Sequence, residues 1–280
     1  MARFEVIIVG VDGSGASEQM TQTLLNLPLF AHSRITLLHV VSSQISADKM
    51  KSEWERGKKL LAASLDSFPV KPGMEVTTQL VEGDPKIVVC EAAAAADNPL
   101  VIMGSRGRNR IAAIFENSVS QYVFQLASCP MLLVKDGIFI KQINRIMVPI
   151  SSAPTSQKAL ELAIEMIKDA PGKQLFLARV QMDPDMGSRD AVVEGAVATL
   201  KRYNIAHQIF AATGDPGPEI TRLAVESGAD LLVMGSPDRR PNAARSLPDL
   251  DRLLGSSTSD YVRVHAECPV LMVRSKTDTD

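Results

Sequence analysis

Apolar and polar positions alternate along the chain in a pattern of short strands and longer helices. Residues 4–11 form an apolar run rich in β-branched side chains, which is typical of a strand buried on both faces. Residues 47–68 are amphipathic and rich in good helix formers, so they predict a long helix. In the first half of the chain the pattern predicts strands at 4–11, 34–41, 74–81, 100–104 and 131–135, and helices at 16–27, 47–68, 85–96 and 118–127.

The second half of the chain repeats the first. Strands separated by helices predict an α/β fold with a parallel, doubly wound sheet and helices on both faces. The segment "VEGDPKIVVCEAAAAADNPLVIMGSRG" at 81–107 matches "ATGDPGPEITRLAVESGADLLVMGSPD" at 212–238, and 118–135 matches 257–274 at a distance of 139 residues. We therefore predict two domains in tandem, 1–138 and 139–280, each an open five-stranded sheet.

The composition excludes several classes of protein. Thirty basic and thirty-two acidic side chains give a net charge of −2, which offers no bulk attraction to nucleic acid or to an anionic membrane. No apolar run approaches the ~20 residues that a membrane span needs. Three scattered cysteines argue against a disulfide framework and a zinc site, and indicate a reducing compartment. With no basic leader before Phe4, we expect a cytoplasmic protein.

Two loops at the carboxyl edge of the first predicted sheet carry candidate chemistry. In such sheets, ligands bind beyond the carboxyl ends of the strands, where the strand order reverses. After the fourth strand, Gly104 and Gly107 would let a ligand approach the backbone, and Ser118 would cap a helix whose N-terminal amides favour an anion. The alternative is a solvated loop.

The other loop is the opening stretch "IIVGVDGSGAS" at residues 7–17. Gly10 and Gly15 have the spacing of a phosphate-binding P-loop, but Ala16 stands where that loop needs lysine. The glycines also lack the order of a dinucleotide fingerprint. What remains is Asp12, whose carboxylate can accept hydrogen bonds from an adenine amine or a ribose hydroxyl. The alternative is a turn in which Asp12 bonds to its own backbone.

Together these segments resemble the universal stress protein family, and the repeat resembles its tandem members. The resemblance rests on "IIVGVDGS", "ITLLHVV", "VEGDP", "VIMGSRG" and "SVSQYVFQLASCPMLLVK", with counterparts in the second copy, and covers nearly the whole chain. It implies a Rossmann-like, adenine nucleotide α-hydrolase-like fold. It also implies that the two copies pack as a pseudo-dimer through their fifth strands, "MLLVK" and "VLMVR". Whether two chains form a homodimer stays open.

The resemblance also implies a nucleotide site. Many members bind ATP through a Gly-x2-Gly-x9-Gly-Ser/Thr loop after strand four, with an aspartate after strand one and a valine after strand two. Carried over to the first domain, the binding residues are Val11, Asp12, Val40, Met103, Gly104, Gly107, Arg108, Asn117, Ser118 and Val119. In the second domain they are Ile150, Val180, Met234, Gly235, Ser256 and Ser257. The implied ligand is ATP, accompanied by Mg²⁺, with ADP and AMP as alternatives.

Three departures from the family pattern separate the two copies. Asn117 replaces the third loop glycine in the first copy, and asparagine tolerates the left-handed backbone better than other side chains do. In the second copy Ser151 replaces the aspartate, and Asp238 replaces the second loop glycine, where its charge would repel a phosphate. We expect the first domain to bind an adenine nucleotide and the second to bind weakly, differently or not at all.

The sequence indicates no catalytic residues. None of the four histidines has a partner at metal-ligand spacing, and no Ser-His-Asp order or nucleophile elbow is present. His39 is interpreted as a core histidine with a satisfied hydrogen bond, and Cys90 as a packing residue of a helix. The function predicted is a nucleotide-binding regulatory module of the stress response, not an enzyme. The alternative is a scaffold or interaction protein whose nucleotide sites have decayed, or which binds another ligand.

Overall fold

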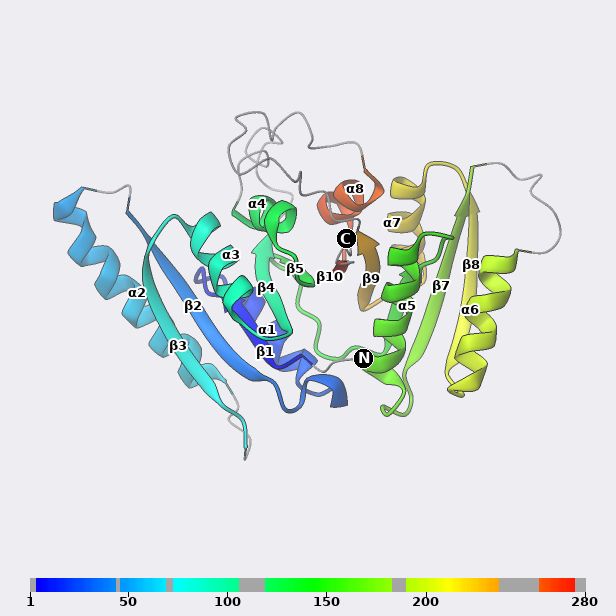
Figure 1. Ribbon diagram of the computed structural model, residues 1–280, viewed down its shortest axis with the longest axis horizontal. Coiled ribbons are helices and arrows are strands. Elements are labelled where there is room, and N and C mark those ends of the chain that lie inside the picture. Colours follow the sequence, from blue (N-terminus) through cyan, green and yellow to red (C-terminus); the bar gives the residue numbers. More distant parts are fainter. Residues whose placement is uncertain are drawn as a thin grey trace, which may run out of the picture. The chain divides into compact units, whose positions relative to one another are not determined.

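The computed structural model describes residues 4–43, 46–68, 73–105, 119–182, 190–236 and 257–274. Contacts within the chain divide it into two compact units, one of residues 2–141 and one of residues 142–280. Each unit has an α/β fold, in which helices pack on the two faces of a central sheet (Figure 1). Among the described residues, no helix is both long and apolar enough to cross a membrane.

The N-terminal unit holds five strands in the order β3-β2-β1-β4-β5. Their bounds are Val6–Gly10 (β1), Arg34–Ser42 (β2), Val76–Gly83 (β3), Pro99–Ser105 (β4) and Met131–Lys135 (β5). Every neighbouring pair is parallel. This confirms the predicted parallel, doubly wound sheet. The strand order reverses between β1 and β4, so ligands are expected at the carboxyl ends of these two strands.

Within the described residues, four α-helices and a short 3-10 helix connect these strands. Their bounds are Ala16–Leu24 (α1), Pro28–Phe30 (the 3-10 turn), Ala47–Ser67 (α2), Pro85–Ala95 (α3) and Val119–Leu126 (α4). The backbone N–H of Lys86 donates to the Asp84 carboxylate at 2.9 Å, so Asp84 caps the N-terminus of α3. Right-handed crossovers place α3 and α4 together on one face, and α1 and α2 on the other (Figure 1).

The C-terminal unit repeats this order of elements. Its strands are Arg145–Pro149 (β6), Gln174–Gln181 (β7), Ala206–Thr213 (β8), Leu231–Ser236 (β9) and Val270–Arg274 (β10), in the order β8-β7-β6-β9-β10. Its helices are Pro154–Ile167 (α5), Ala191–Arg202 (α6), Pro216–Glu226 (α7) and Thr258–His265 (α8). Neighbouring strands are again parallel. The internal repeat in the sequence is therefore a repeat of the fold.

The core of each unit lies between the central strands and the helices on both faces. Side chains of the inner strands are fully buried, which explains why these strands are apolar runs with little alternation. They include Ile7, Val9, Leu37, Leu100, Ile102 and Leu132 in the first unit and Ile146, Val148, Leu175, Leu177, Leu232 and Leu271 in the second. Cys129 and Cys268, just before the fifth strands, are buried in the equivalent place.

Candidate functional site

The carboxyl ends of β1 and β4 meet at the switch point of the N-terminal unit. The two strands pair with Val9 beside Ile102, so Gly10 follows next to Met103. A methyl group on Gly10 would lie 3.4 Å from Met103 Cγ, which means that the buried Met103 side chain covers this glycine. The chain then leaves β1 through buried Val11 and exposed Asp12.

Asp12 has a different environment at each of its carboxylate oxygens. Oδ1 accepts a hydrogen bond from the backbone N–H of Ser14 at 2.8 Å, which closes the turn after β1. Oδ2 lies 3.0 Å from the point that a side-chain carbon on Gly104 would occupy. One oxygen therefore makes the turn that the sequence offered as an alternative, and the other faces β4. The structure brings Asp12 and Gly104 together, as the resemblance implied.

Gly104 has to be small because of this carboxylate. Any side chain at 104 would begin 3.0 Å from Asp12 Oδ2 and 3.8 Å from the hydroxyl of Ser17, which lies in the first turn of α1. Contacts at 3.0 Å between a methyl carbon and an oxygen are closer than packing allows. The glycine therefore lets the Asp12 carboxylate and the Ser17 hydroxyl lie close to the backbone of β4.

His39 is a positioning residue that the sequence interpretation did not include in the site. Its Nδ1 lies 2.7 Å from the carbonyl oxygen of Val11, and because a carbonyl only accepts, this nitrogen donates. The backbone N–H of Val11 donates in turn to the carbonyl of Leu38 at 2.9 Å. These bonds fix the residue that precedes Asp12. His39 is half-buried, so its hydrogen bond matches the interpretation and its role in the turn extends it.

The remaining predicted residues of this site divide into two groups. Val40 is half-buried in β2 next to Val81 of β3, and Val119 is the first residue of α4. Gly107, Arg108, Asn117 and Ser118 lie outside the residues that the structure describes. The predicted contacts at these four residues stay predictions.

The corresponding place in the C-terminal unit is filled by backbone. A side-chain carbon on Gly235 would lie 2.3 Å from the carbonyl oxygen of Thr155, in the first turn of α5. Ser151, which stands where Asp12 does, donates its N–H to Ser156 Oγ at 2.9 Å and accepts from the N–H of Ala153 at 3.3 Å. The first turn of α5 therefore lies directly on β9.

The start of α8 differs from a phosphate site as well. Ser257 Oγ accepts from the N–H of Asp260 at 3.2 Å and donates to the Asp260 carboxylate at 2.7 Å. This buried carboxylate lies in the first helical turn, where the helix dipole favours negative charge, and 3.9 Å from the buried Arg263 guanidinium, so it already takes the place of an anion there. In the first unit Gln121 stands at the equivalent position.

The other predicted residues of the second unit lie along its strands. Ile150 is buried, and its N–H donates to the carbonyl of Ala178 at 2.9 Å, as Val11 does to Leu38. Val180 is half-buried in β7 and Met234 is buried in β9. Ser256 and Asp238 lie outside the described residues.

Arg179 occupies the position of His39 in the second unit and makes a different contact. Its Nε lies 2.5 Å from the Asp190 carboxylate, which also caps α6 by accepting from the N–H of Val192 at 3.0 Å. The hydrogen bond from Arg179 holds the pKa of Asp190 below its ordinary value. Arg179 therefore binds the capping residue of α6, whereas His39 in the first unit binds the backbone after β1.

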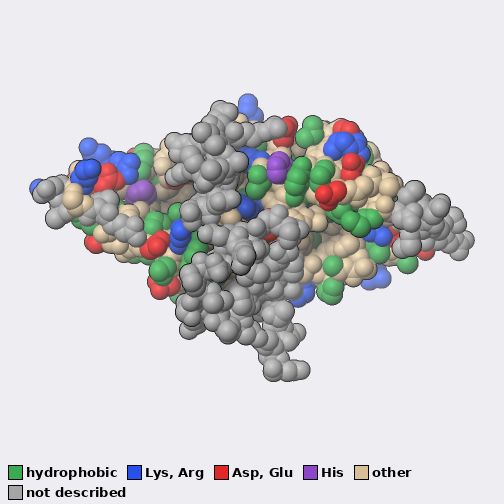
Figure 2. Space-filling view, turned by 90° about the horizontal axis from the view of Figure 1, so that it is seen from above, with side chains coloured by type: hydrophobic (Ala, Val, Ile, Leu, Met, Phe, Trp, Pro, Cys, Tyr) green, Lys and Arg blue, Asp and Glu red, His purple; other side chains and the backbone are tan. Residues whose placement is uncertain are grey.

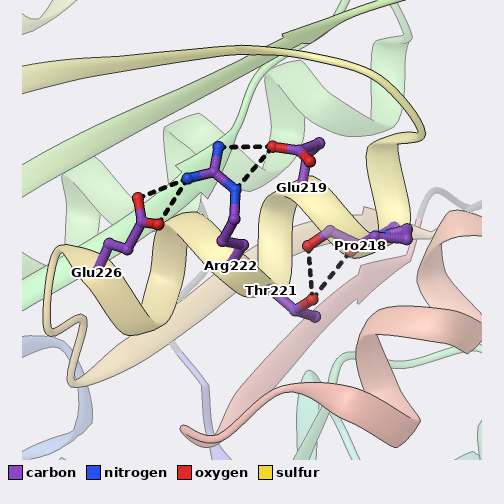
Figure 3. Close-up of polar contacts among 6 residues, drawn as sticks. Pro218, Glu219, Thr221, Arg222 and Glu226 are labelled. Carbon is purple, nitrogen blue, oxygen red and sulfur yellow. Dashed lines mark hydrogen bonds and ion pairs between the residues drawn. The ribbon is translucent and has the colours of Figure 1, made fainter.

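Two other features outside the strand ends have structural explanations. On α7, Arg222 pairs with two glutamates: its Nη2 lies 2.6 Å from the Glu219 carboxylate and its Nη1 lies 2.6 Å from the Glu226 carboxylate (Figure 3). These exposed ion pairs stabilise one face of the helix.

Cys90 lies on α3, at the position equivalent to Thr221 on α7. Burial raises the pKa of the Cys90 thiol to about 11. At neutral pH Cys90 is therefore a thiol and a poor nucleophile, in agreement with a packing role.

On the face shown in Figure 2, the charged side chains of the described residues include both signs. Basic and acidic side chains stand next to each other at both ends of this face. In the N-terminal unit, Lys58 pairs with Glu55 at 2.9 Å on the exposed side of α2. The electrostatic character of a binding site must therefore come from local groups such as Asp12.

Comparisons with known proteins agree with one another. A model of the universal stress protein family matches residues 3–135 and again residues 142–274. Universal stress protein Mb2028c of Mycobacterium bovis is 23% identical over 301 residues, which cover 96% of each chain. Universal stress protein MJ0531 of Methanocaldococcus jannaschii is 23% identical over 144 residues, 47% of this chain and 82% of its own length.

Two solved structures have the same fold over almost the whole chain. The crystal structure of a universal stress protein from Archaeoglobus fulgidus aligns with a TM-score of 0.75 and 20% identity, over 98% of this chain and 99% of that one. The functionally unknown protein PA1789 of Pseudomonas aeruginosa aligns with a TM-score of 0.64 and 16% identity, over 97% and 92%. At these identities the likeness concerns the fold.

Proposed function

Because this chain belongs to the universal stress protein family, whose general role is the stress response, we propose that its N-terminal unit binds an adenine nucleotide. The ligand proposed is ATP, with ADP and AMP as weaker alternatives. The nucleotide would act as a signal and not as a substrate, so the protein would be a regulatory module. Within the described residues no group of three or more His, Cys, Asp and Glu side chains gathers as a metal site would require.

One observation carries this proposal. Asp12 is exposed at the switch point of the sheet, with Oδ2 beside Gly104 of β4 and Oδ1 held by the N–H of Ser14. A carboxylate that is fixed by one oxygen and open at the other is a preorganised acceptor for hydroxyl or amine groups. The hydrogen bond from His39 to Val11 holds the same turn from the other side.

Mg²⁺ would reach the protein together with ATP. This cation prefers oxygen ligands and keeps several waters, so it is commonly held by phosphates with one or two carboxylates. Asp12 is a carboxylate at the carboxyl end of β1 and could be one of these ligands. We propose that the phosphates and water supply most of its ligands, and that the predicted loop residues Gly107, Arg108, Asn117 and Ser118 contact the phosphates.

The C-terminal unit is proposed not to bind a nucleotide. The contact between Thr155 and Gly235 leaves no space between α5 and β9, and the carboxylate of Asp260 occupies the start of α8. Its role in the proposal is structural. We propose that the chain forms two domains, 1–138 and 139–280, which pair through β5 and β10. We also propose that the protein acts in the cytoplasm. A scaffold that binds no nucleotide is the competing function, and Ser151 and Asp260 favour it for this unit.

The proposal is tested on the full chain as purified from its host. After denaturation, mass spectrometry of the released small molecules should find ATP or ADP at up to about one equivalent per chain. Calorimetric titration of the nucleotide-free protein with Mg-ATP should give one site. A protein that carries no nucleotide and shows no thermal shift with Mg-ATP would overturn the proposal.

Asp12→Ala gives the residue-level test of this function. Removing the carboxylate takes away the charged acceptor, so affinity for ATP should fall by at least about tenfold, the equivalent of roughly 1.4 kcal/mol. Ser151→Ala changes the corresponding residue of the C-terminal unit and should leave ATP binding unchanged. Equal binding by wild type and Asp12→Ala would show that the carboxylate is only part of the turn.

A further inference from the structure

The N-terminal unit has a pocket at the edge of its sheet opposite to Asp12. Asn26, which follows α1, and Met74, which precedes β3, both line it, so it lies at the amino ends of the strands. Its volume is about 280 Å³, close to the lower limit of about 300–1,000 Å³ for pockets that hold small ligands. The pocket is therefore separate from the proposed nucleotide site and suits a small molecule.

Lys141 gives this pocket a positive pole. It is exposed, and the described residues that line the pocket include no Asp or Glu. The carbonyl oxygen of Ile140 accepts hydrogen bonds from Gln19 Nε2 at 2.8 Å and from Thr23 Oγ1 at 2.7 Å. Two side chains of α1 therefore hold the backbone that carries Lys141 against the pocket. A cation held in this way attracts an anionic group of a ligand.

The C-terminal end of α1 gives the same pocket a negative pole. Leu25, which caps this end of the helix, and Asn26 both line the pocket. The last carbonyl groups of a helix carry about half an elementary charge of negative sign, which a basic side chain in the last turn commonly offsets. The last turn of α1 contains no basic side chain. This end of the helix therefore favours a cationic group.

Gln22 adds a hydrogen-bond acceptor from the last turns of α1. Its Nε2 donates to the carbonyl of Ser67, the last residue of α2, at 3.2 Å. This bond orients the carboxamide and leaves the Oε1 atom as its acceptor. Leu25 and Met74 contribute apolar atoms to the lining.

The two poles restrict the chemistry of the ligand. A phosphate or a simple carboxylate is attracted by Lys141 but meets the negative end of α1. A simple amine is attracted by the end of α1 but repelled by Lys141. A free α-amino acid carries an ammonium group and a carboxylate on one carbon atom, so it satisfies both poles, and it is small enough for the pocket.

We propose that this pocket binds a free α-amino acid, with its carboxylate at Lys141 and its ammonium group at the C-terminal end of α1, where Gln22 Oε1 accepts a hydrogen bond from it. This inference is independent of the proposed nucleotide, which lies at the other edge of the sheet. The protein would then bind two kinds of small molecule.

The test adds each of the protein L-amino acids alone to the full chain, first in thermal unfolding and then in calorimetric titration. At least one should raise the melting temperature and bind with a Kd of about 1 mM or tighter. Its N-acetyl derivative and its carboxamide each lack one of the two charges, so each should bind about tenfold more weakly. If no amino acid binds at this level, the inference is wrong.

Two substitutions and a matched control locate the site. Lys141→Gln removes the positive pole and Gln22→Met removes the acceptor, so each should weaken binding of that amino acid about five- to tenfold. Lys59 is exposed on α2 and lies outside the described lining, so Lys59→Gln should bind as wild type does. Equal binding by all four proteins would mean that the amino acid binds elsewhere, and would overturn the inference.

Sodium acetate and inorganic phosphate test whether the pocket is a site for any anion. If either salt raises the melting temperature as much as the amino acid does, and Lys141→Gln removes the effect, then Lys141 binds anions without regard to an ammonium group and the inference fails. Asp12→Ala should bind the amino acid as wild type does. A failure of nucleotide binding would therefore leave this inference standing, and the reverse also holds.

Discussion

At the scale of single residues, the site depends on the absence of a side chain at Gly104. Gly104 leaves the Asp12 carboxylate its place, since a methyl group there would lie 3.0 Å from Oδ2. Gly104→Ala should push the carboxylate aside and weaken ATP binding by about tenfold or more. Because Asp12 is exposed and would lose only its hydrogen bond from Ser14 by turning away, the melting temperature should change by less than about 4 °C. Titration calorimetry and thermal unfolding measure the two effects.

Gly10 and Gly235 provide matched controls for this substitution. Gly10→Ala adds a methyl group 3.4 Å from the flexible Met103 side chain, so both binding and stability should be nearly unchanged. Gly235→Ala places its methyl group 2.3 Å from the backbone of Thr155, which cannot give way locally, so it should lower stability by about 1–3 kcal/mol and leave affinity alone. A Gly104→Ala protein that unfolds like Gly235→Ala would contradict a binding role for the carboxylate beside Gly104.

At the scale of elements, α2 packs on its sheet through a glycine in the middle of a helix. A side-chain carbon on Gly57 would lie 2.7 Å from Leu80 Cδ1 and 2.8 Å from His39 Cδ2. Alanine favours a helix over glycine by about 1 kcal/mol, but the overlap acts in the opposite direction. Gly57→Ala should therefore destabilise the protein by about 1–2 kcal/mol, measured by urea unfolding.

Gly195 is the control for α2 because it lies within α6 with no atom near its missing side chain. Nothing lies within 4 Å of that position, so Gly195→Ala should stabilise the protein by about 0.5–1 kcal/mol through helix propensity. Since His39 also holds Val11, Gly57→Ala should weaken ATP binding as well, whereas Gly195→Ala should not. If Gly57→Ala and Gly195→Ala both stabilise the protein, a side chain at position 57 of α2 does not contact His39.

The elements themselves could be predicted because their signals are local. The apolar run before Asp12 and the Asp84-Pro85 cap give β1 and α3 directly from the sequence. The helix predicted at 16–27 ends earlier, at Leu24, because Pro28 starts a separate 3-10 turn. Contacts between elements leave no such signal. The bond from His39 to Val11 depends on how closely β2 approaches the end of β1, and so does the burial of the Ser17 hydroxyl, which has no hydrogen-bond partner among the residues that the structure describes.

At the scale of the whole molecule, the two copies of the fold differ in how their helices pack on the sheet as well as in the residues at the predicted binding positions. From the sequence we expect the second copy to bind weakly, differently or not at all, because Ser151 replaces the aspartate and Asp238 replaces the second loop glycine. The structure adds a helix, since the backbone in the first turn of α5 lies on Gly235, whereas the nearest neighbour of Gly104 in the first unit is the side chain of Asp12. A missing carboxylate can be restored by one substitution, but a helix in contact with a strand cannot be moved by one.

Ser151→Asp therefore should not create a second nucleotide site. The new carboxylate would stand at the position of Asp12, but the backbone of Thr155 would still lie against Gly235, and the Asp260 carboxylate would still occupy the start of α8. Titration with Mg-ATP should give a stoichiometry of one per chain in both wild type and Ser151→Asp, and none in Ser151→Asp combined with Asp12→Ala. A stoichiometry of two in Ser151→Asp would show that the carboxylate alone separates the copies and that α5 moves aside when a ligand binds.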